Sequence, residues 1–359
     1  MVARADNTRV TLSWAEAPGA QGYNLFWASE PYVDSDNIGA FTGGDWREGV
    51  SSPVTITELA NETTYYFVVT ATRGAEESPD SVEVSATPRS DAGRQQPTAQ
   101  EVLMLELINR ARANPEAEAA RYGIDLNESL APGTITPAPK PPLAFNTQLM
   151  HASREHSQWM LNTNRFSHTG ALGSSPSDRA ADADYTGGLC CWENIAWAGT
   201  SGGNINLSDR IKSHHEGLFQ SSGHRTNILE TNVQVLGVGQ LKGTMQSSNG
   251  RLWLASMVTE MFARESQHYL TGVIYQDLNG NQFYDVGEGI GGAQITAGGE
   301  SMTTPDTGVY ALPLSEGTHT VTVSGSPIPT EVSQSISIES ANRKLDVIVE
   351  GTEVSVNTW

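Results

Sequence analysis

The sequence has no long apolar run, few basic residues and almost no cysteine. No stretch approaches the roughly 18 consecutive apolar residues that a membrane-spanning helix needs. Lys and Arg number 21 against 41 Asp and Glu, and no basic stripe interrupts the net charge of −20, so nucleic acid is not an expected partner. Two cysteines exclude a framework of several disulfides, and the cores must therefore be held by apolar burial.

The two cysteines, Cys190 and Cys191, are neighbours in the sequence. Adjacent Cα atoms lie about 3.8 Å apart, below the usual disulfide span of roughly 4.4–6.8 Å. We therefore expect two separate thiols. A vicinal disulfide and a redox or metal role are the alternatives.

The first ten residues, MVARADNTRV, lack the apolar segment of a signal peptide. The protein is then either cytoplasmic or an exported protein whose signal peptide has been removed or cut off. The acidic charge lies at the two ends, with 13 acidic against 5 basic residues up to residue 89, and 11 against 2 after residue 268. Such a surface suits an extracellular, calcium-rich setting, and the domain content also favours export.

Residues 1–88 carry the pattern of a β-sandwich. Apolar residues alternate along residues 9–14, 22–28, 64–71 and 81–88, between clusters of turn residues. The segment resembles a fibronectin type III domain, with Trp14 at the core tryptophan position and Leu59 and Tyr65 at the spacing of the tyrosine corner. We expect this domain to be a spacer. Residues 89–97 are expected to be a polar linker.

In residues 98–267 the apolar residues change from the alternating spacing of strands to the spacing of helices. Thr98 and Glu101 predict a capping box at a helix start, and an apolar helical stripe follows. Further helices are expected over residues 147–161 and 208–220, whereas the proline-rich residues 131–142 must form a loop. Strand-like runs occupy residues 233–241 and 251–263. Helices followed by strands predict an α+β sandwich.

Several strings in this segment resemble the CAP superfamily of cysteine-rich secretory proteins, antigen 5 and pathogenesis-related-1 proteins. They are ELINRAR, PLAFNTQLMHASREHSQWM, FSHTG, WENIA, GHRTNIL, LGVGQL and MVTEMFA, and they occur in the order of the family. The GHRTNIL string is similar to bacterial members. The resemblance implies an α-β-α sandwich with a central cavity that gathers His and Glu side chains.

The resemblance also implies which residues line that cavity. By motif match they are His168, Glu193 and His224, and His215 and Glu260 are further candidates. The segment departs from the eukaryotic pattern in three places, the first of which is Leu218 in place of the tryptophan before the GHR motif. Met257 stands where the second histidine of those members lies, and a glutamic acid, residue 260, replaces their usual glutamine.

Two imidazoles and a carboxylate permit three interpretations of this site. They suit Zn²⁺ with an open coordination position, or a general base with an orienting carboxylate. They could also form a buried polar network that holds loops together without reacting. Ser221 and Ser222, beside His224, are expected to cap a helix rather than to act as nucleophiles.

Residues 277–288, DLNGNQFYDVGE, follow the pattern of an EF-hand-type calcium loop. Ca²⁺ binds six to eight oxygen atoms, and a tight loop turns alternate side chains inward. The expected ligands at positions 1, 3, 5, 7, 9 and 12 are Asp277, Asn279, Asn281, the carbonyl of Phe283, Asp285 and Glu288. Position 6, usually glycine at positive φ, is Gln282, for which a left-handed conformation costs about 1–2 kcal/mol.

Strand-like runs surround this loop, and residues 268–350 are therefore expected to form a second β-sandwich. The strings GVIYQDLNGNQFYDVGE, TGVYALPL and EGTHTVTV resemble the calcium-binding B repeats of staphylococcal-type surface adhesins. The resemblance implies a spacer that calcium makes rigid. Residues 351–359 are expected to be a tail that begins a further strand or a linker.

The sequence thus predicts a secreted or cell-surface bacterial protein with a β-sandwich, an α+β CAP sandwich and a calcium-loop β-sandwich. Its expected function is binding or adhesion, with a small ligand, a lipid or an extracellular polymer as partner. A protease-like secreted hydrolase that uses the CAP cavity is the alternative, and a purely structural surface protein is the third. Ca²⁺ is the expected cofactor, with Zn²⁺ as an alternative in the CAP cavity.

Overall fold

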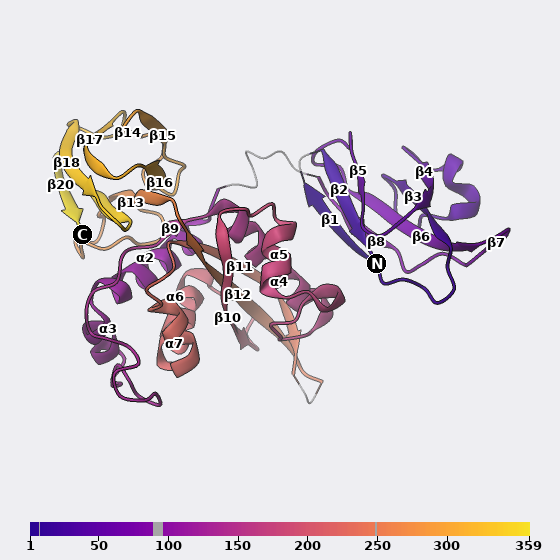
Figure 1. The fold of residues 1–359 in the computed structure, drawn as a ribbon, viewed down its shortest axis with the longest axis horizontal. Helices are drawn as coiled ribbons and strands as arrows, with labels where there is room; N and C mark the ends of the chain where they lie inside the picture. The colour runs from indigo at the N-terminus through magenta and orange to yellow at the C-terminus, as the bar shows by residue number, and fades with distance from the viewer. Residues whose placement is uncertain (7, 89–95, 248–249) are drawn as a thin grey trace. The chain divides into compact units, whose positions relative to one another are not determined.

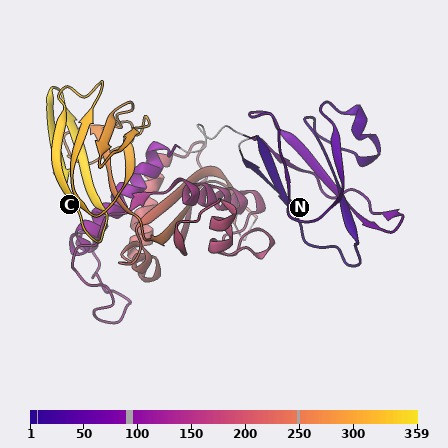
Figure 2. The same ribbon diagram turned by 45° about the horizontal axis from the view of Figure 1, so that its top comes forward.

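The computed structural model describes residues 1–6, 8–88, 96–247 and 250–359. They form two compact units, Met1–Gln95 and Gln96–Trp359 (Figures 1 and 2). Most of the expected linker over residues 89–97 lies outside the described residues. No helix in the described part of the chain is both long and apolar enough to cross a membrane.

The first unit consists of two antiparallel sheets with a common apolar core. One sheet has the order β1 (Val2–Asp6), β2 (Arg9–Ser13), β5 (Val54–Ile56). The other has the order β4 (Asp45–Val50), β3 (Gly22–Ala28), β6 (Tyr65–Arg73), β7 (Glu76–Glu77), with β8 (Val84–Ala86) also paired to β6. Leu12 from one sheet and Leu25 and Phe67 from the other are completely buried in that core. The strands expected from the alternating pattern are thus confirmed.

The second unit contains a four-stranded sheet covered by helices on both faces. The strand order is β10 (Gly188–Thr200), β12 (Leu252–Glu265), β11 (Val235–Gln246), β9 (Ala144–Phe145), and only β9 is parallel to its neighbour. Helices α4 (Thr147–Thr163) and α5 (Pro176–Asp182) lie on one face, and α2 (Ala99–Ala113), α6 (Leu207–Gln220) and α7 (Ser222–Ile228) lie on the other (Figure 1). Successive strand residues alternate between the faces: Leu236 packs in the cluster of α2 and α6, and Val235 in the cluster of α4.

The helix boundaries follow from local signals in the sequence. The capping box of Thr98 and Glu101 starts α2, as expected, and both of its hydrogen bonds are present. Asn114 ends α2 and caps α3 (Pro115–Arg121), whose first residue is proline. Helices α4 and α6 match the helices expected over residues 147–161 and 208–220 within two residues.

Two glycines of β11 let α4 lie unusually close to the sheet. A Cβ atom at Gly237 would lie 2.1 Å from the carbonyl carbon of Leu149, and one at Gly239 would lie 2.2 Å from the amide nitrogen of Arg154. Ser153 and Ser157 on α4 donate hydrogen bonds to the carbonyls of these two glycines. The close crossing fixes the position of α4 over the sheet.

The C-terminal part of the second unit is a sandwich of two four-stranded sheets. Their orders are β16 (Val309–Leu314), β13 (His268–Gln276), β19 (Arg343–Glu350), β20 (Glu353–Thr358), and β15 (Glu300–Thr303), β14 (Gln294–Ala297), β17 (Gly317–Ser324), β18 (Val332–Ile338). The tail over residues 351–359 forms the further strand that was one of the two expectations for it. Strand β20 pairs antiparallel with β19 along its whole length, which satisfies the backbone groups on that side of β19.

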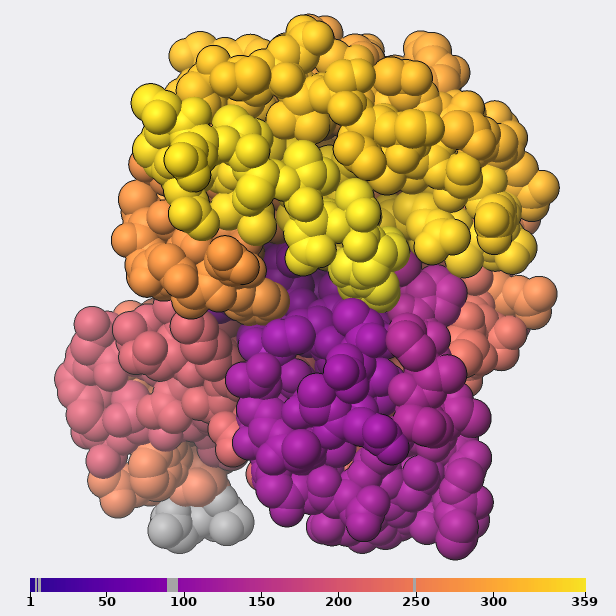
Figure 3. Space-filling view, turned by 90° about the vertical axis from the view of Figure 1, so that its left-hand side faces the viewer, coloured from indigo at the N-terminus to yellow at the C-terminus, as the bar shows by residue number. Residues whose placement is uncertain are grey.

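This sandwich shares an apolar core with the helices beneath it. Val273, Tyr284 and Ile348 of the sandwich belong to the same buried cluster as Ile108 of α2. Lys344 on β19 is buried and lies 2.9 Å from the carboxylate of Glu106 on α2. Figure 3 shows the yellow and orange surface of the sandwich resting directly on the magenta surface of the earlier residues.

Candidate functional site

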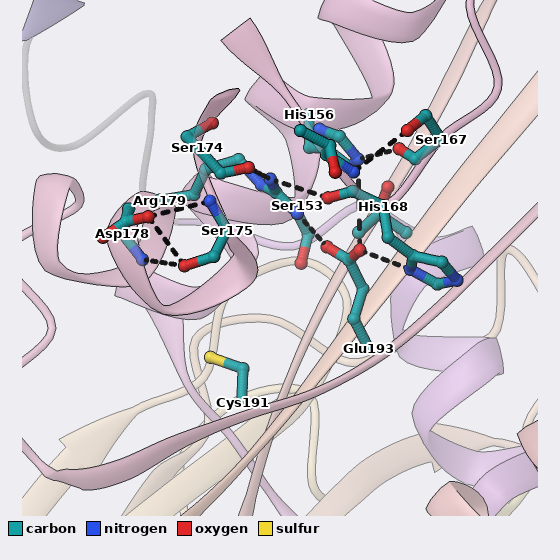
Figure 4. A network of polar contacts seen from close by, with 12 residues as sticks. Ser153, His156, Ser167, His168, Ser174, Ser175, Asp178, Arg179, Cys191 and Glu193 are labelled. Carbon is teal, nitrogen blue, oxygen red and sulfur yellow. Dashed lines mark hydrogen bonds and ion pairs between the residues drawn. The ribbon is translucent and has the colours of Figure 1, made fainter. Parts of the chain in front are cut away.

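Glu193 is the centre of a polar site at the edge of the sheet. It lies on the edge strand β10, and its side chain is only 2% exposed. Oε1 lies 2.8 Å from Nδ1 of His168, and Oε2 lies 2.5 Å from Nη2 of Arg179 (Figure 4). An ionised carboxylate can only accept hydrogen bonds, so both partners donate. Each oxygen of Glu193 therefore already has a donor.

Arg179 is a member of this site that our reading of the sequence missed. It lies on α5, whose capping box of Ser175 and Asp178 was a readable signal for a helix at this point. Its Nη1 donates to the carbonyl oxygens of His168 and Ser174, at 3.1 and 2.9 Å. Arg179 thus neutralises the buried carboxylate and also holds the loop that carries His168.

His156 is the second residue that sequence reasoning did not assign to the site. It lies on α4, and its Nε2 is 2.9 Å from the carbonyl of Ser167 and 4.0 Å from Oε1 of Glu193. Its ring stacks on Trp159 with 5.6 Å between the ring centres. Burial lowers the pKa of His156 to about 4, against the opposing effect of Glu193, so this imidazole is neutral at pH 7. Its role is to support the loop.

His168 is the accessible member of the group. Its side chain is 54% exposed, and Nδ1 is held by Glu193. Nε2 makes no hydrogen bond to any described residue, and Figure 4 shows this side of the ring turned away from Glu193. A neutral imidazole held in this way presents a lone pair outward, and it can accept a hydrogen bond, take a proton or bind a metal.

His224 reaches the same strand from the opposite face of the sheet. The side-chain amide of Asn194 donates to the carbonyl of His224 at 3.3 Å, and Asn227 donates to the carbonyl of Glu193 at 3.3 Å. These bonds fasten α7 to β10. Burial, and then the nearby charge of His168, lower the pKa of His224. The structure therefore joins His168 directly to Glu193, whereas His224 lies close enough to feel the charge of His168 but has Ser221 as its side-chain partner.

Ser221 does not act as the side-chain cap that we expected. It occupies the position before α7, but its side chain caps no backbone N–H. Its hydroxyl instead lies 2.8 Å from Nδ1 of His224. Ser221 and His224 therefore form a hydroxyl–imidazole pair.

The structure places His215 elsewhere. Its Nε2 lies 2.9 Å from Glu118 on α3, and its ring packs against Tyr122 and Phe219. Burial raises the pKa of Glu118, but hydrogen bonds from His215 and Arg110 more than reverse this and bring it to about 2. The neighbouring His214 bonds to Ser256 rather than to the site.

Glu260 lies behind α7 rather than beside Glu193. It pairs across the strands with Asn194, whose amide donates to Oε2 at 2.9 Å. Because successive residues of a strand face opposite sides, Glu260 and Glu193 lie on opposite faces of the sheet. Complete burial raises the pKa of Glu260 to about 7. Met257, where a second histidine would stand, is completely buried in the apolar cluster of α4.

The structure places the sulfur atoms of Cys190 and Cys191 against each other, the arrangement of the vicinal disulfide that was the alternative to two separate thiols. The pairing of β10 with β12 shifts register between Cys190 and Trp192. The two cysteines pack against the cluster that contains Ala180 and Tyr185, and the hydroxyl of Ser177 donates to the carbonyl of Cys190 at 2.7 Å.

The His168 site does not fit Zn²⁺. Among the described residues, no group of three or more His, Cys, Asp or Glu side chains is arranged to hold a metal ion. The carboxylate of Glu193 already has a full cationic partner in Arg179. A zinc ion would have to displace that guanidinium from a buried position.

The loop of residues 277–288 offers oxygen atoms, the donor type of Ca²⁺, although, among the residues that the structure describes, its three carboxylates are not gathered into a metal-holding group. All six expected ligands supply oxygen, which is the ligand type of calcium. Gln282 at position 6 has φ of 56°, the left-handed conformation that this position requires. The carboxylate of Asp277 accepts hydrogen bonds from the backbone N–H groups of Gly280, Asn281 and Gln282.

The other two carboxylates of the loop are engaged differently. Glu288 accepts from the backbone N–H groups of Leu278 and Asp285, at 3.1 and 2.7 Å. The carboxylate of Asp285 lies 2.7 Å from Nζ of Lys212, a residue of α6. A lysine ammonium thus stands at one of the expected calcium ligands.

Residues 105–256 match the sequence model of the cysteine-rich secretory protein family, abbreviated CAP. No curated protein matches the chain. An extracellular protein with an SCP domain from Bacillus anthracis str. Ames is similar in structure, at 17% identity and a TM-score of 0.30, over 58% of this chain and 66% of that one. An Fn3-like protein from Clostridium thermocellum is similar at 23% identity and a TM-score of 0.20, over 25% of this chain and 90% of that one. Scores this low support no statement about activity.

Proposed function

Because residues 105–256 form a CAP domain, we propose that this chain is a secreted or surface-attached binding protein whose CAP site contacts its ligand through His168. The engagement of Glu193 by both Arg179 and His168 carries this proposal. A carboxylate that already has two donors is poorly suited to bind a metal or to take a proton. Its remaining role is to orient His168.

The polar atoms of the site that remain exposed determine which ligands it can contact. Nε2 of His168 is the exposed polar atom of the group, and the buried charge of Glu193 is balanced by Arg179. Such a site attracts neither strong anions nor cations by net charge. It suits a neutral or weakly charged ligand with hydrogen-bonding groups, such as a polysaccharide chain or the head group of a lipid.

The binding test uses the imidazole itself as reporter. We would record the ring resonances of His168 by NMR while adding, in turn, chitotetraose, a short-chain phosphatidylcholine below its micelle concentration, and zinc chloride. We expect one of the first two to shift the ring and zinc to leave it unchanged. Calorimetry with the ligand that shifts the ring should show that His168→Ala abolishes the binding and that His319→Ala, at a histidine of the C-terminal sandwich, keeps it. A ring that neither of the first two ligands shifts contradicts the proposal.

A secreted hydrolase is the second candidate, and one contact favours it. The hydroxyl of Ser221 lies 2.8 Å from His224, within the reach that a nucleophile and its base require. His224 accepts or donates through Nδ1 only, and no carboxylate among the described residues orients its other nitrogen. Hydrolysis of p-nitrophenyl acetate or of a fluorescent casein that Ser221→Ala abolishes would establish this candidate over binding.

The C-terminal sandwich is proposed to bind Ca²⁺ through residues 277–288 and thereby to become more rigid. The all-oxygen donor set and the positive φ of Gln282 support this proposal. Calcium should raise the melting temperature of the full chain relative to the same sample in EGTA. Glu288→Gln should remove that rise, and Glu316→Gln, at an exposed residue outside the loop, should keep it. A melting temperature that calcium does not change contradicts this part of the account.

A further inference from the structure

The loop of residues 277–288 is packed onto the helices of the CAP domain. Arg110 of α2 lies with its guanidinium 5.0 Å from the ring centre of Phe283, and it also holds Glu118. Phe283 and Val286 pack against the apolar cluster shared by the two domains. The loop is therefore positioned beside α6 by apolar and cation–π contacts, whatever else it binds.

Asp285 is the point where the loop meets a positive charge of α6. Its Oδ1 accepts from Nζ of Lys212 at 2.7 Å, and its Oδ2 accepts from the side-chain amides of Asn279 and Asn281, at 3.0 and 2.8 Å. Partial burial raises the pKa of Asp285, but these hydrogen bonds, with Lys212 first, reverse the effect and bring the pKa below its usual value. Three of the expected calcium ligands, Asp285, Asn279 and Asn281, are thus hydrogen-bonded to one another. The Lys212 ammonium contacts the same carboxylate.

We infer that Lys212 is an internal counter-ion of this loop, which competes with calcium for Asp285 and is released from it when calcium binds. The inference rests on the proposed binding of calcium. The physical reason is that Lys212 and calcium would share one carboxylate, with Lys212 on Oδ1 and the other expected ligands gathered at Oδ2, and that two cations held this close repel each other. Lys212 is 53% exposed, so it can move into water when released.

This competition links the loop to the CAP domain. Lys212 lies on α6, the helix that runs into α7 and His224. Calcium that displaces Lys212 removes a contact between α6 and the sandwich. By linkage, whatever holds Lys212 on Asp285 weakens calcium binding by the same factor.

Calcium titration calorimetry on the full chain tests the inference. We expect Lys212→Gln to bind calcium about fivefold more tightly than the wild-type chain, because the competing ammonium and its repulsion are gone. The matched control is Lys242→Gln, which removes a lysine of the same domain that contacts Asn204 and not the loop. Its affinity should equal that of the wild type. The difference between wild type and Lys212→Gln should shrink at high salt, since exposed charges are screened.

The outcomes separate this inference from the calcium proposal on which it rests. A wild-type chain that binds calcium, with Lys212→Gln binding equally or more weakly, overturns the counter-ion role alone. Folded chains that all fail to bind calcium, Lys212→Gln included, overturn both. As a second measurement, calcium should change the NMR signals of the Lys212 ammonium end in the wild type. In Asp285→Asn, which has already lost the ion pair, it should leave them nearly unchanged.

Discussion

Arg179 and Glu193 form a buried ion pair in which Nη2 lies 2.5 Å from Oε2. A buried carboxylate without a partner is strongly unfavourable, and removing one member of such a pair costs about 3–5 kcal/mol. This pair explains how the CAP site keeps a charged glutamate in a position with almost no access to water. It also explains why His168, and not Glu193, is the residue of this site that a ligand can contact.

Arg179→Met should therefore destabilise the second unit by about 3–5 kcal/mol, because it leaves Glu193 charged and buried. Glu193→Gln added to that variant should restore much of the loss, since no charge then remains unpaired. Urea denaturation followed by tryptophan fluorescence measures both values. An Arg179→Met chain within about 1 kcal/mol of the wild type would show that the pair is not what holds the loop.

The stability of the chain should fall in acid partly because of His156. Its folded-state pKa of about 4 lies below the ordinary value of 6.5, so the unfolded chain takes up the proton first. The stability that depends on neutral His156 is complete above pH 6.5 and is lost as the pH falls through 4. His156→Gln should flatten the curve of unfolding free energy against pH in that window. An unchanged slope would contradict the assignment.

Glu260 should make the stability of the chain fall as the pH rises, which is opposite to the effect of His156. Its pKa of about 7 in the folded chain lies above the ordinary value of 4.5, so the stability that it contributes is complete below pH 4.5 and is lost as the pH rises through 7. Glu260→Gln keeps the shape without the charge and should raise stability by about 2–3 kcal/mol at pH 8. At pH 4.5 it should change little. Chemical denaturation at both pH values measures the change in unfolding free energy that Glu260→Gln causes. Equal changes at pH 8 and pH 4.5 would refute the prediction.

The contact between the CAP domain and the C-terminal sandwich should depend on Lys344. This buried lysine pairs with Glu106 across the contact and with Asp346 on its own strand. Lys344→Met leaves two buried carboxylates unpaired and should cost about 3–5 kcal/mol. We expect it also to split the single unfolding transition of residues 96–359 into two. A calorimetric scan that keeps one transition at the wild-type temperature would contradict the structural account.

Much of this architecture could be predicted because its signals are local. The capping box of Thr98 and Glu101 marks a helix start within four residues, and the alternation along β3 and β6 reports which side chains face a core. The order of the CAP motifs identified the domain and brought out His168, Glu193 and His224 before their geometry was known.

The partners of those residues could not be predicted in the same way. Arg179 reaches Glu193 only because α5 packs over the edge strand β10, and a shift of one residue, about 100° around the helix, would point it elsewhere. His215 faces Glu118 rather than His168 because of how α6 packs against α3, which the helical period alone does not determine. Lys212 meets Asp285 through contact between two domains that the sequence presents as separate.

The most direct test of the central claim is the tautomer of His168 near neutral pH, measured by long-range proton–nitrogen NMR on the ring. We predict a proton on Nδ1, donated to Glu193, and an unprotonated Nε2 that faces the ligand. Glu193→Gln should weaken that preference. A ring with its proton on Nε2 would mean that Glu193 does not orient His168, and it would contradict the proposed mode of binding.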